Sequence, residues 1–204
     1  TAMRSDRPYQ ALYGVLQGGH WQDLREKAAH DLTEMSVEGW EFDGFGLGGA
    51  FEKENLGQIL AWMTRILPEN KPRHLLGLSK PDDIFAGVEN GADTFDCVAP
   101  TREARHGRIY TLDGDINLKR AEFKDDQRLL DAECDCPTCM AGMTRANLRA
   151  KLKSLDMSDR SEAMTLLSQH NVRFIIRLME QIRIALEDGR FGELRETWLR
   201  RYYG

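Results

Sequence analysis

The stretch RHLLGLSKPDDIFAGVENG, residues 73–91, combines two patterns that decide the fold class. Its first part is a short apolar run bounded by turn residues, which is typical of a buried strand. The second part starts with Pro81 and ends with Gly91, residues that favour the first turn and the end of a helix respectively. The stretch therefore predicts a strand over residues 73–79 and a helix over residues 81–91.

The same alternation extends toward both ends of the chain. The expected elements are strands over residues 11–17, 42–49 and 93–100, and helices over residues 21–36 and 51–67. Strands that alternate with helices predict an α/β fold with a parallel sheet. Such βα units fit half of a (β/α)8 barrel or a small doubly wound sheet, and periodicity alone does not choose between them.

The pattern changes after Pro100. Residues 108–123 predict a hairpin that turns at Asp113 and Gly114. A cysteine-rich segment follows, and a helical pattern then runs from about Ser158, with an apolar stripe formed by Met164, Leu167, Phe174, Leu178 and Ile182. We expect three parts: residues 1–100, an inserted or appended metal-binding subdomain over 101–157, and a helical segment over 158–204.

Composition excludes several classes of protein. The 204 residues are 41% hydrophobic, enough for a real core, and the formal net charge of −5 argues against a uniformly basic nucleic-acid binder. No apolar run approaches the roughly 20 residues that cross a bilayer, and the first ten residues lack the apolar segment of a signal peptide. We therefore expect a cytoplasmic protein without a membrane partner.

Three of the four cysteines lie within six residues. Cys134, Cys136 and Cys139 have the C-x-C-x2-C spacing that directs three thiolates at one ion, and Zn²⁺ prefers four such ligands in a tetrahedron. His170, on the inward stripe of the long helix, is the best candidate for the fourth ligand. A closed shell of this kind predicts a structural zinc. The alternative is a buried core histidine beside ordinary thiols.

Six motifs occur in the order YGVLQGG, GLGG, HLLGL, TFDCVAPTR, CDCPTC and QHN. Together they resemble the tRNA-guanine transglycosylases, which replace a guanine in tRNA with a 7-deazaguanine base. The resemblance covers essentially the whole chain. It implies a (β/α)8 barrel with an inserted zinc subdomain, of which this chain carries strands five to eight. The first four strands, with the DSGGFQ motif and its second catalytic aspartate, would be a missing N-terminal half, so we expect little turnover by this chain alone.

The resemblance also implies roles for individual residues. Asp96, in TFDCVAPTR, matches the nucleophile; taken alone, it would be a loop residue. Gln17 matches a glutamine that contacts the base through its amide, and Gly48 and Gly49 match glycines that approach it. Leu76 and Gly77 match the floor on which the base stacks. Without the resemblance, these positions would be a strand-end glutamine, turn glycines and barrel core.

Residues 50–54, AFEKE, depart from the family's usual run, although Glu54 keeps the position of its glutamate. The identity of the deazaguanine, queuine or its precursor, is therefore open, and so is a relative acting on DNA.

Residues 144–153 carry positive charges and no negative one, and Arg145, Arg149 and Lys153 recur every four residues. A helix would align them as a stripe suited to phosphates, although a solvated face is the alternative. In the light of the resemblance, this stripe is expected to contact tRNA, and Arg102, Arg105 and Arg108 to hold the backbone beside the extracted nucleotide. A homodimer is implied by resemblance only. The competing hypothesis is a non-catalytic, zinc-containing RNA-binding or dimerising subunit.

Overall fold

The computed structural model describes residues 10–49, 54–78 and 80–204, and it divides the chain into two compact units, residues 1–97 and 98–204. The boundary lies close to the expected one at residue 100. The expected parts 101–157 and 158–204 lie together in the second unit, because the long helix of that unit packs against the segments before it.

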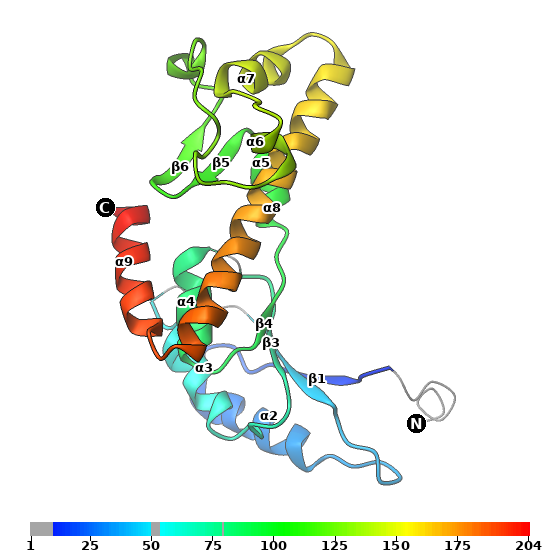
Figure 1. Cartoon of the computed structure of the whole chain (residues 1–204). Helices are drawn as coiled ribbons and strands as arrows, with labels where there is room; N and C mark the ends of the chain where they lie inside the picture. Colours follow the sequence, from blue (N-terminus) through cyan, green and yellow to red (C-terminus); the bar gives the residue numbers. More distant parts are fainter. Residues whose placement is uncertain (1–9, 50–53, 79) are drawn as a thin grey trace. The chain divides into compact units, whose positions relative to one another are not determined.

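The unit 1–97 alternates strands and helices (Figure 1). In chain order these are β1 Tyr13–Leu16, α2 Gln22–Glu34, β2 Gly44–Leu47, α3 Leu56–Thr64, β3 Arg73–Leu75, α4 Pro81–Glu89 and β4 Thr94–Phe95. The strands form one parallel sheet in the order β1-β2-β3-β4. The prediction of an α/β fold with a parallel sheet is therefore confirmed.

The order of the strands in the sheet follows their order in the chain. A doubly wound sheet reverses its order at a switch point, whereas a barrel adds each strand beside the previous one. Among the described strands no reversal occurs. Successive right-handed crossovers then place the helices on one face, where Ala29 of α2 and Ile59 and Leu60 of α3 bury against Leu16 and Leu75 of the strands.

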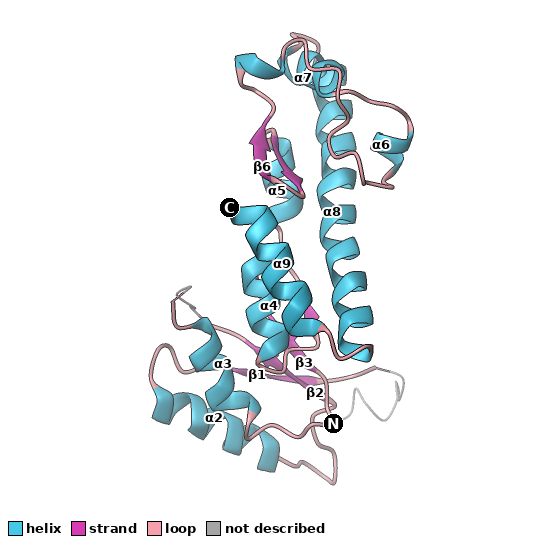
Figure 2. Cartoon of the chain, turned by 60° about the vertical axis from the view of Figure 1, so that its left-hand side comes forward, coloured by secondary structure: helices cyan, strands magenta, loops and turns pink. Residues whose placement is uncertain are grey.

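The unit 98–204 contains one hairpin and several helices (Figure 2). Its elements are α5 Ala99–Arg105, β5 Arg108–Thr111, β6 Gly114–Asn117, the 3-10 helix η1 Ala121–Phe123, α6 Pro137–Met140, α7 Arg145–Lys153, α8 Met157–Glu187 and α9 Phe191–Tyr203. The strands β5 and β6 are antiparallel. No helix in the described ranges combines the length and apolarity needed to cross a membrane.

Two predicted elements need correction. The strand expected over residues 93–100 is only Thr94–Phe95, because α5 begins at Ala99 and carries Pro100 in its first turn, where proline is accommodated. The hairpin turns at Leu112 and Asp113, since Gly114 already pairs with Thr111. Residues 51–53 of the expected helix 51–67 and residue 79 of the expected strand 73–79 lie outside the described residues.

The core of the unit 98–204 forms along α8. Leu167, Phe174, Leu178 and Ile182 of the predicted stripe are buried, and Met164 is half-buried. Phe174 packs against Trp198 of α9 with ring centroids 5.8 Å apart. This packing holds α9 against α8, although the sequence patterns did not single out α9 as a separate helix.

Candidate functional site

The carboxyl ends of the four strands of the unit 1–97 lie at one edge of the sheet. Leu16 is in register with Leu47, Leu47 with Leu75, and Leu75 with Phe95. The residue that follows each of these was predicted to be functional: Gln17, Gly48, Leu76 and Asp96. The register therefore brings four predicted site residues, from segments up to 79 positions apart in the sequence, to one edge.

Gly48 lies directly against the side chain of Gln17. A Cβ at position 48 would lie 2.8 Å from Gln17 Nε2, closer than a carbon atom can come. Gly49 has a positive φ of 114°, a conformation that side chains rarely adopt. Glycine at these positions therefore leaves room for the Gln17 amide and lets backbone face the edge.

Arg25, which was not among the predicted residues, is hydrogen-bonded to both glycine loops. Its Nε donates a hydrogen bond to the carbonyl of Gly19 at 2.8 Å, and its Nη1 donates to the carbonyl of Gly48. The side chain is fully buried, and burial lowers the pKa of its guanidinium. A signal existed, because Arg25 lies four residues before Ala29 on the inward face of α2.

Asp96 is exposed, and its carboxylate is hydrogen-bonded by groups of β3 and of the loop that follows it. Its Oδ1 accepts a hydrogen bond from the backbone N–H of Gly77 at 3.2 Å and lies 3.1 Å from His74 Nε2. Gly77 has a positive φ of 78°, a conformation that residues other than glycine rarely adopt. His74 was not among the predicted residues, although strand alternation places it on the same face as its register partner Thr94.

The remaining residues expected at the base site are Leu76 and the segment around Glu54. Leu76 is half-buried, and its Cδ1 would lie 3.5 Å from a Cβ at Gly46 on the neighbouring strand. Glu54 is exposed in the turn before α3. The rest of the divergent segment, Ala50 to Lys53, lies outside the described residues.

In the unit 98–204, the predicted ligand set meets in one buried cluster. One ligand atom from each of Cys134, Cys136, Cys139 and His170 lies within 4.8 Å of all the others. His170 Nδ1 lies 3.6 Å from Cys136 Sγ and 3.5 Å from Cys139 Sγ. All four side chains are buried. This arrangement could hold a metal ion.

His170 is oriented for this role by a backbone carbonyl. Its Nε2 donates a hydrogen bond to Tyr110 O at 2.8 Å, which leaves the lone pair of Nδ1 facing the thiols. The next residue, Asn171, accepts a hydrogen bond from the N–H of the same Tyr110 at 3.1 Å. Two side chains of the QHN motif, His170 and Asn171, are therefore hydrogen-bonded to the carbonyl and the N–H of the same β5 residue.

The crowded sulfur atoms shift each other's ionisation. Hydrogen bonds from Cys134 and Cys139 lower the pKa of Cys136, and hydrogen bonding to Cys134 and Cys136 raises the pKa of Cys139. Burial opposes protonation of His170, but the neighbouring sulfur atoms and Tyr110 O raise the pKa of its imidazole to about 9. A raised imidazole pKa beside the Cys136 thiolate favours a proton on Nδ1 of His170 when no ion is bound, and a cation that binds there would displace this proton and the remaining thiol protons.

Local contacts hold the cysteine loop against α8. Cys136 caps α6, and its Sγ accepts a hydrogen bond from the backbone N–H of Cys139 at 3.3 Å. Thr138 Oγ1 donates to the carbonyl of Leu166 at 2.8 Å. Asp135 binds Arg173 through two hydrogen bonds of 2.7 and 2.6 Å. These contacts bring the three thiols to the histidine.

The predicted basic stripe on α7 forms, but its members differ in their surroundings. Arg145 donates to the carbonyls of Leu129 and Leu130, both at 2.9 Å, and its side chain is 13% exposed. Arg149 is half-buried and donates to the carbonyl of Arg120, and Lys153 is exposed. Arg145 therefore has a structural role in the loop before α7.

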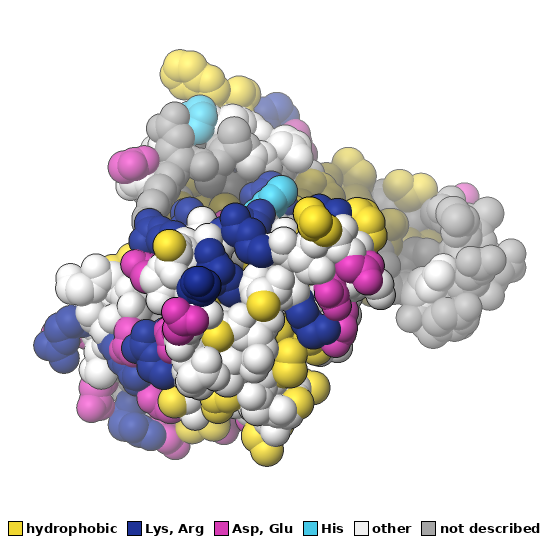
Figure 3. Space-filling model, turned by 90° about the horizontal axis from the view of Figure 1, so that it is seen from above, with side chains coloured by type: hydrophobic (Ala, Val, Ile, Leu, Met, Phe, Trp, Pro, Cys, Tyr) yellow, Lys and Arg dark blue, Asp and Glu magenta, His cyan; other side chains and the backbone are white. Residues whose placement is uncertain are grey.

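Figure 3 shows the side of the unit 98–204 on which α7 lies. Lys and Arg side chains there are interspersed with Asp and Glu, so this face does not carry one sign of charge. Arg102 and Arg105 are exposed on α5, whereas Arg108 on β5 donates to Asp115 at 3.2 Å. Among the arginines expected beside the nucleotide, Arg102 and Arg105 are therefore exposed, whereas Arg108 is hydrogen-bonded within the chain.

Residues 1–204 match the protein family described as Queuine tRNA-ribosyltransferase. The chain belongs to this family. Proteins named queuine tRNA-ribosyltransferase from Streptococcus pneumoniae strains Hungary19A-6, CGSP14 and TIGR4 are each 43% identical to it over 197 residues, which is 96% of this chain and 50% of each relative. The chain therefore spans about half the length of the curated relatives it matches.

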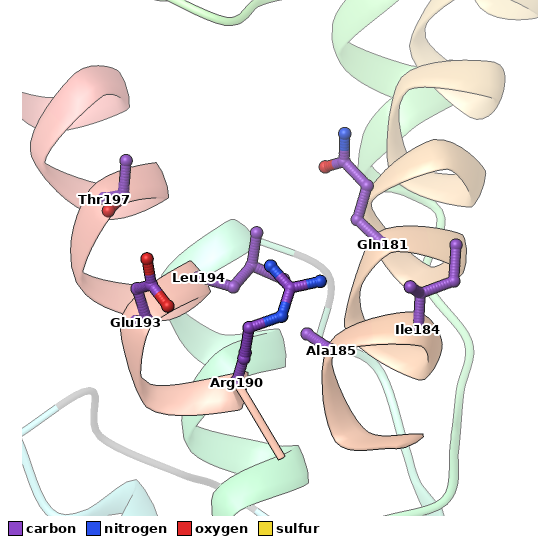
Figure 4. A pocket seen from close by; sticks show the side chains of 7 residues that line it. All are labelled: Gln181, Ile184, Ala185, Arg190, Glu193, Leu194 and Thr197. Carbon is purple, nitrogen blue, oxygen red and sulfur yellow. The ribbon is translucent and has the colours of Figure 1, made fainter. Parts of the chain in front are cut away.

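Two cavities of the unit 98–204 lie beside α8. A groove of about 610 Å³ between α5 and α8 is lined by the predicted residue Arg105, together with Thr101, Ser161, Met164, Thr165, Ser168, Gln169 and Val172. A smaller cavity of about 310 Å³ lies between α8 and α9 (Figure 4). Its lining residues are Gln181, Ile184, Ala185, Arg190, Glu193, Leu194 and Thr197, none of which was predicted to be functional.

Proposed function

We propose that this chain carries the catalytic carboxylate of a tRNA-guanine transglycosylase, which exchanges a guanine in tRNA for a 7-deazaguanine base. One observation carries the proposal: the register of the parallel sheet aligns Gln17, Gly48, Leu76 and Asp96 at the carboxyl edge of the strands. Active sites of (β/α)8 barrels lie at this edge, because loops from every strand meet there. The family match and the names of the relatives support the same reaction.

The nucleophile would be the carboxylate of Asp96. One of its oxygens bonds to the anomeric carbon of the ribose as the bond from that carbon to guanine N9 breaks. The electron pair leaves with guanine, which takes up a proton from water. The incoming base then gives its N9 proton to the hydroxide left by that water and attacks the same carbon, and the ester oxygen departs with its electron pair as a carboxylate. Two displacements retain the configuration of the sugar, as in retaining glycosidases.

Gln17 and the glycines would recognise the base. A side-chain amide offers both a donor and an acceptor, which matches the edge of a guanine-like base. Gly48, Gly49 and Gly77 present backbone without a Cβ, and Leu76 supplies an apolar surface on which a base can stack. Queuine and its precursor differ in their side arms, which the segment around Glu54 would meet.

The barrel would be completed by further strands. β1 is an edge strand of the described sheet, and Val15 within it and Leu12 just before it are each 49% exposed. Apolar side chains on an open edge favour pairing with another strand. We propose that a missing N-terminal half covers this edge and supplies the second catalytic aspartate, so that this chain alone turns over little or no substrate.

The metal would be zinc in a structural site. Zn–S bonds of about 2.3 Å and Zn–N bonds of about 2.0 Å at tetrahedral angles separate sulfur from nitrogen by about 3.5 Å. The corresponding distances from His170 Nδ1 are 3.6 and 3.5 Å. Three cysteines and one histidine fill the shell, so the ion would join the loop to α8 and take no part in the exchange.

Contacts with tRNA would involve both α5 and α7. Arg105 lines the groove between α5 and α8 beside Thr101 and Gln169, and residues of these types commonly bind phosphate and sugar. Arg102, Arg149 and Lys153 would add charge, while Arg108 and Arg145 would mainly organise the protein. Each phosphate contact adds up to about 0.9 to the slope of log affinity against log salt. We also propose that the protein forms a homodimer.

The test is guanine exchange. The chain, supplied in trans with the N-terminal half of a curated relative, is incubated with tRNA and labelled guanine. Asp96→Ala should abolish incorporation of labelled guanine and formation of the covalent protein–RNA adduct seen on a denaturing gel, while tRNA affinity stays nearly unchanged. The control is Asp125→Ala, which removes an exposed carboxylate in the other unit and should change neither incorporation nor adduct formation.

Undiminished exchange by Asp96→Ala would overturn the proposal. Tight tRNA binding without exchange by the unsubstituted protein would favour a non-catalytic RNA-binding or dimerising subunit. Exchange of guanine into DNA but not into tRNA would show that DNA is the substrate.

A further inference from the structure

The proposed nucleophile, Asp96, has a neighbour on the adjacent strand β3, the side chain of His74. His74 and Thr94 are register partners on β3 and β4, and Asp96 follows Thr94 by two residues, so all three side chains share one face of the sheet. Leu75 and Phe95 point to the other face, because both lie against Gly87 of α4. The face of His74 is therefore the one turned away from α4.

Two hydrogen bonds converge on one oxygen of Asp96. His74 Nε2 lies 3.1 Å and the Gly77 nitrogen 3.2 Å from Oδ1. Among the residues that the structure describes, the hydrogen bonds to this carboxylate all reach Oδ1. Oδ2 is thereby distinguished from Oδ1 and left available to react.

The direction of the histidine hydrogen bond follows from its partners. An ionised carboxylate only accepts, so the proton must be on Nε2 of His74. Nδ1 lies 2.8 Å from Thr94 Oγ1, whose hydroxyl can donate to a neutral ring or accept from a charged one. Nε2–H therefore faces Asp96 in either charge state of the imidazole.

We propose that His74 is a positioning residue for the nucleophile, an inference that rests on the proposed function. Its Nε2–H and the Gly77 N–H hold Oδ1, so that Oδ2 is presented to the anomeric carbon. When Oδ2 forms the ester bond, the bond to guanine breaks and its electron pair leaves with the base, which takes a proton from water. Oδ1 remains as the ester carbonyl and keeps both donors. The same donors stabilise the carboxylate released in the second displacement.

The side chain is placed for this role rather than for the core. The side chain of His74 is 25% exposed and that of Asp96 is 60% exposed, so both are open to a ligand. Because a displacement needs the attacking oxygen close to and aligned with the carbon, loss of one orienting contact slows the reaction even when the nucleophile is intact.

Two substitutions separate positioning from packing. In His74→Gln, the amide nitrogen lies as many bonds from Cβ as Nε2 does and can still donate to Asp96. In His74→Asn, the nitrogen corresponds to Nδ1 and reaches only toward Thr94. In the complemented exchange assay, His74→Asn should lower kcat about 10- to 100-fold with an unchanged KM for tRNA, and His74→Gln should stay within about threefold of the unsubstituted protein. His30→Asn, on an exposed site of α2, is the matched control.

The contact is also measured on the chain itself, independently of exchange. In ¹⁵N-histidine spectra, His74 should carry its proton on Nε2, and Asp96→Ala should shift that resonance while leaving His30 unchanged. An unshifted resonance, equal losses for both substitutions, or a loss confined to KM would overturn the inference. Exchange that survives Asp96→Ala would instead overturn the proposed function.

Discussion

The side chain of Asn171 offers a sharp test of how the unit 98–204 is held together. It is fully buried in α8. It accepts a hydrogen bond from the N–H of Tyr110 at 3.1 Å and donates to the carbonyls of Pro100 and Arg108, each at 3.0 Å. The amide thus uses its oxygen and both N–H groups to tie α8 to α5 and β5.

Asn171→Leu keeps the branching and approximate length of the side chain and removes all three hydrogen bonds. Each buried backbone group left without its partner costs about 1–3 kcal/mol. For three groups, partly offset by greater apolar burial, we expect a loss of about 3–6 kcal/mol in the free energy of unfolding. Native domains are stable by only about 5–15 kcal/mol, so the loss should be easily measured.

The assay is urea unfolding of the whole chain with zinc in excess, followed by circular dichroism and tryptophan fluorescence. With a slope of about 1–3 kcal/mol per M, the transition of this unit should move down by about 1 M or more. Gln169→Leu is the matched control, because Gln169 lies two residues earlier on α8 and is exposed. We expect that control to change stability by less than about 0.5 kcal/mol.

Asn171→Asp provides a second comparison. A carboxylate can still accept from Tyr110 N–H but cannot donate to the two carbonyls, so this variant should be at least as unstable as Asn171→Leu. If Asn171→Leu unfolds at the same urea concentration as Gln169→Leu, the hydrogen bonds of Asn171 do not stabilise the unit and the reasoning is wrong.

Removal of metal with a chelator should lower the melting temperature of the unit 98–204 markedly, because structural zinc in small peptides contributes about 10–16 kcal/mol of binding free energy. Calorimetry with and without chelator measures the change in melting temperature. In Cys136→Ser, the chelator should no longer change the melting temperature. Burial and a hydrogen bond to Asp115 raise the pKa of Tyr202 above its ordinary value. The folded protein therefore keeps this proton when the unfolded chain loses it, so the stabilisation is complete below about pH 10 and falls by up to about 1.4 kcal/mol per pH unit above it. Urea unfolding from pH 8 to 11 should show this loss, and Tyr202→Phe should have a shallower slope; equal slopes would contradict it.

Much of the fold follows from short-range patterns. Pro81 and Gly91 predicted the bounds of α4 to within two residues, and the apolar stripe of α8 was predicted with its buried face. The strand end at Phe95 was missed, because α5 begins only four residues later and an apolar segment does not reveal where extended backbone gives way to a helix.

The sites divide in the same way. Cysteine spacing predicted the loop that joins His170, since three thiols within six residues need little else to converge. Arg25 and His74 were missed, because their roles depend on partners brought close by the sheet: Gly48 for Arg25 and Asp96 for His74. Periodicity places Arg25 on the inward face of α2 and His74 on one face of β3, but it does not reveal which distant residue each of them meets.

The sequence by itself determined the local elements and the chemistry available at their ends. Backbone propensity, proline and glycine conformation, and ligand spacing all act over a few residues. Only the tertiary structure decided which distant groups meet, such as Asn171 with Tyr110 across 61 residues. Strand register and the burial of polar groups depend on the free energy of the whole packed unit, which no single segment contains.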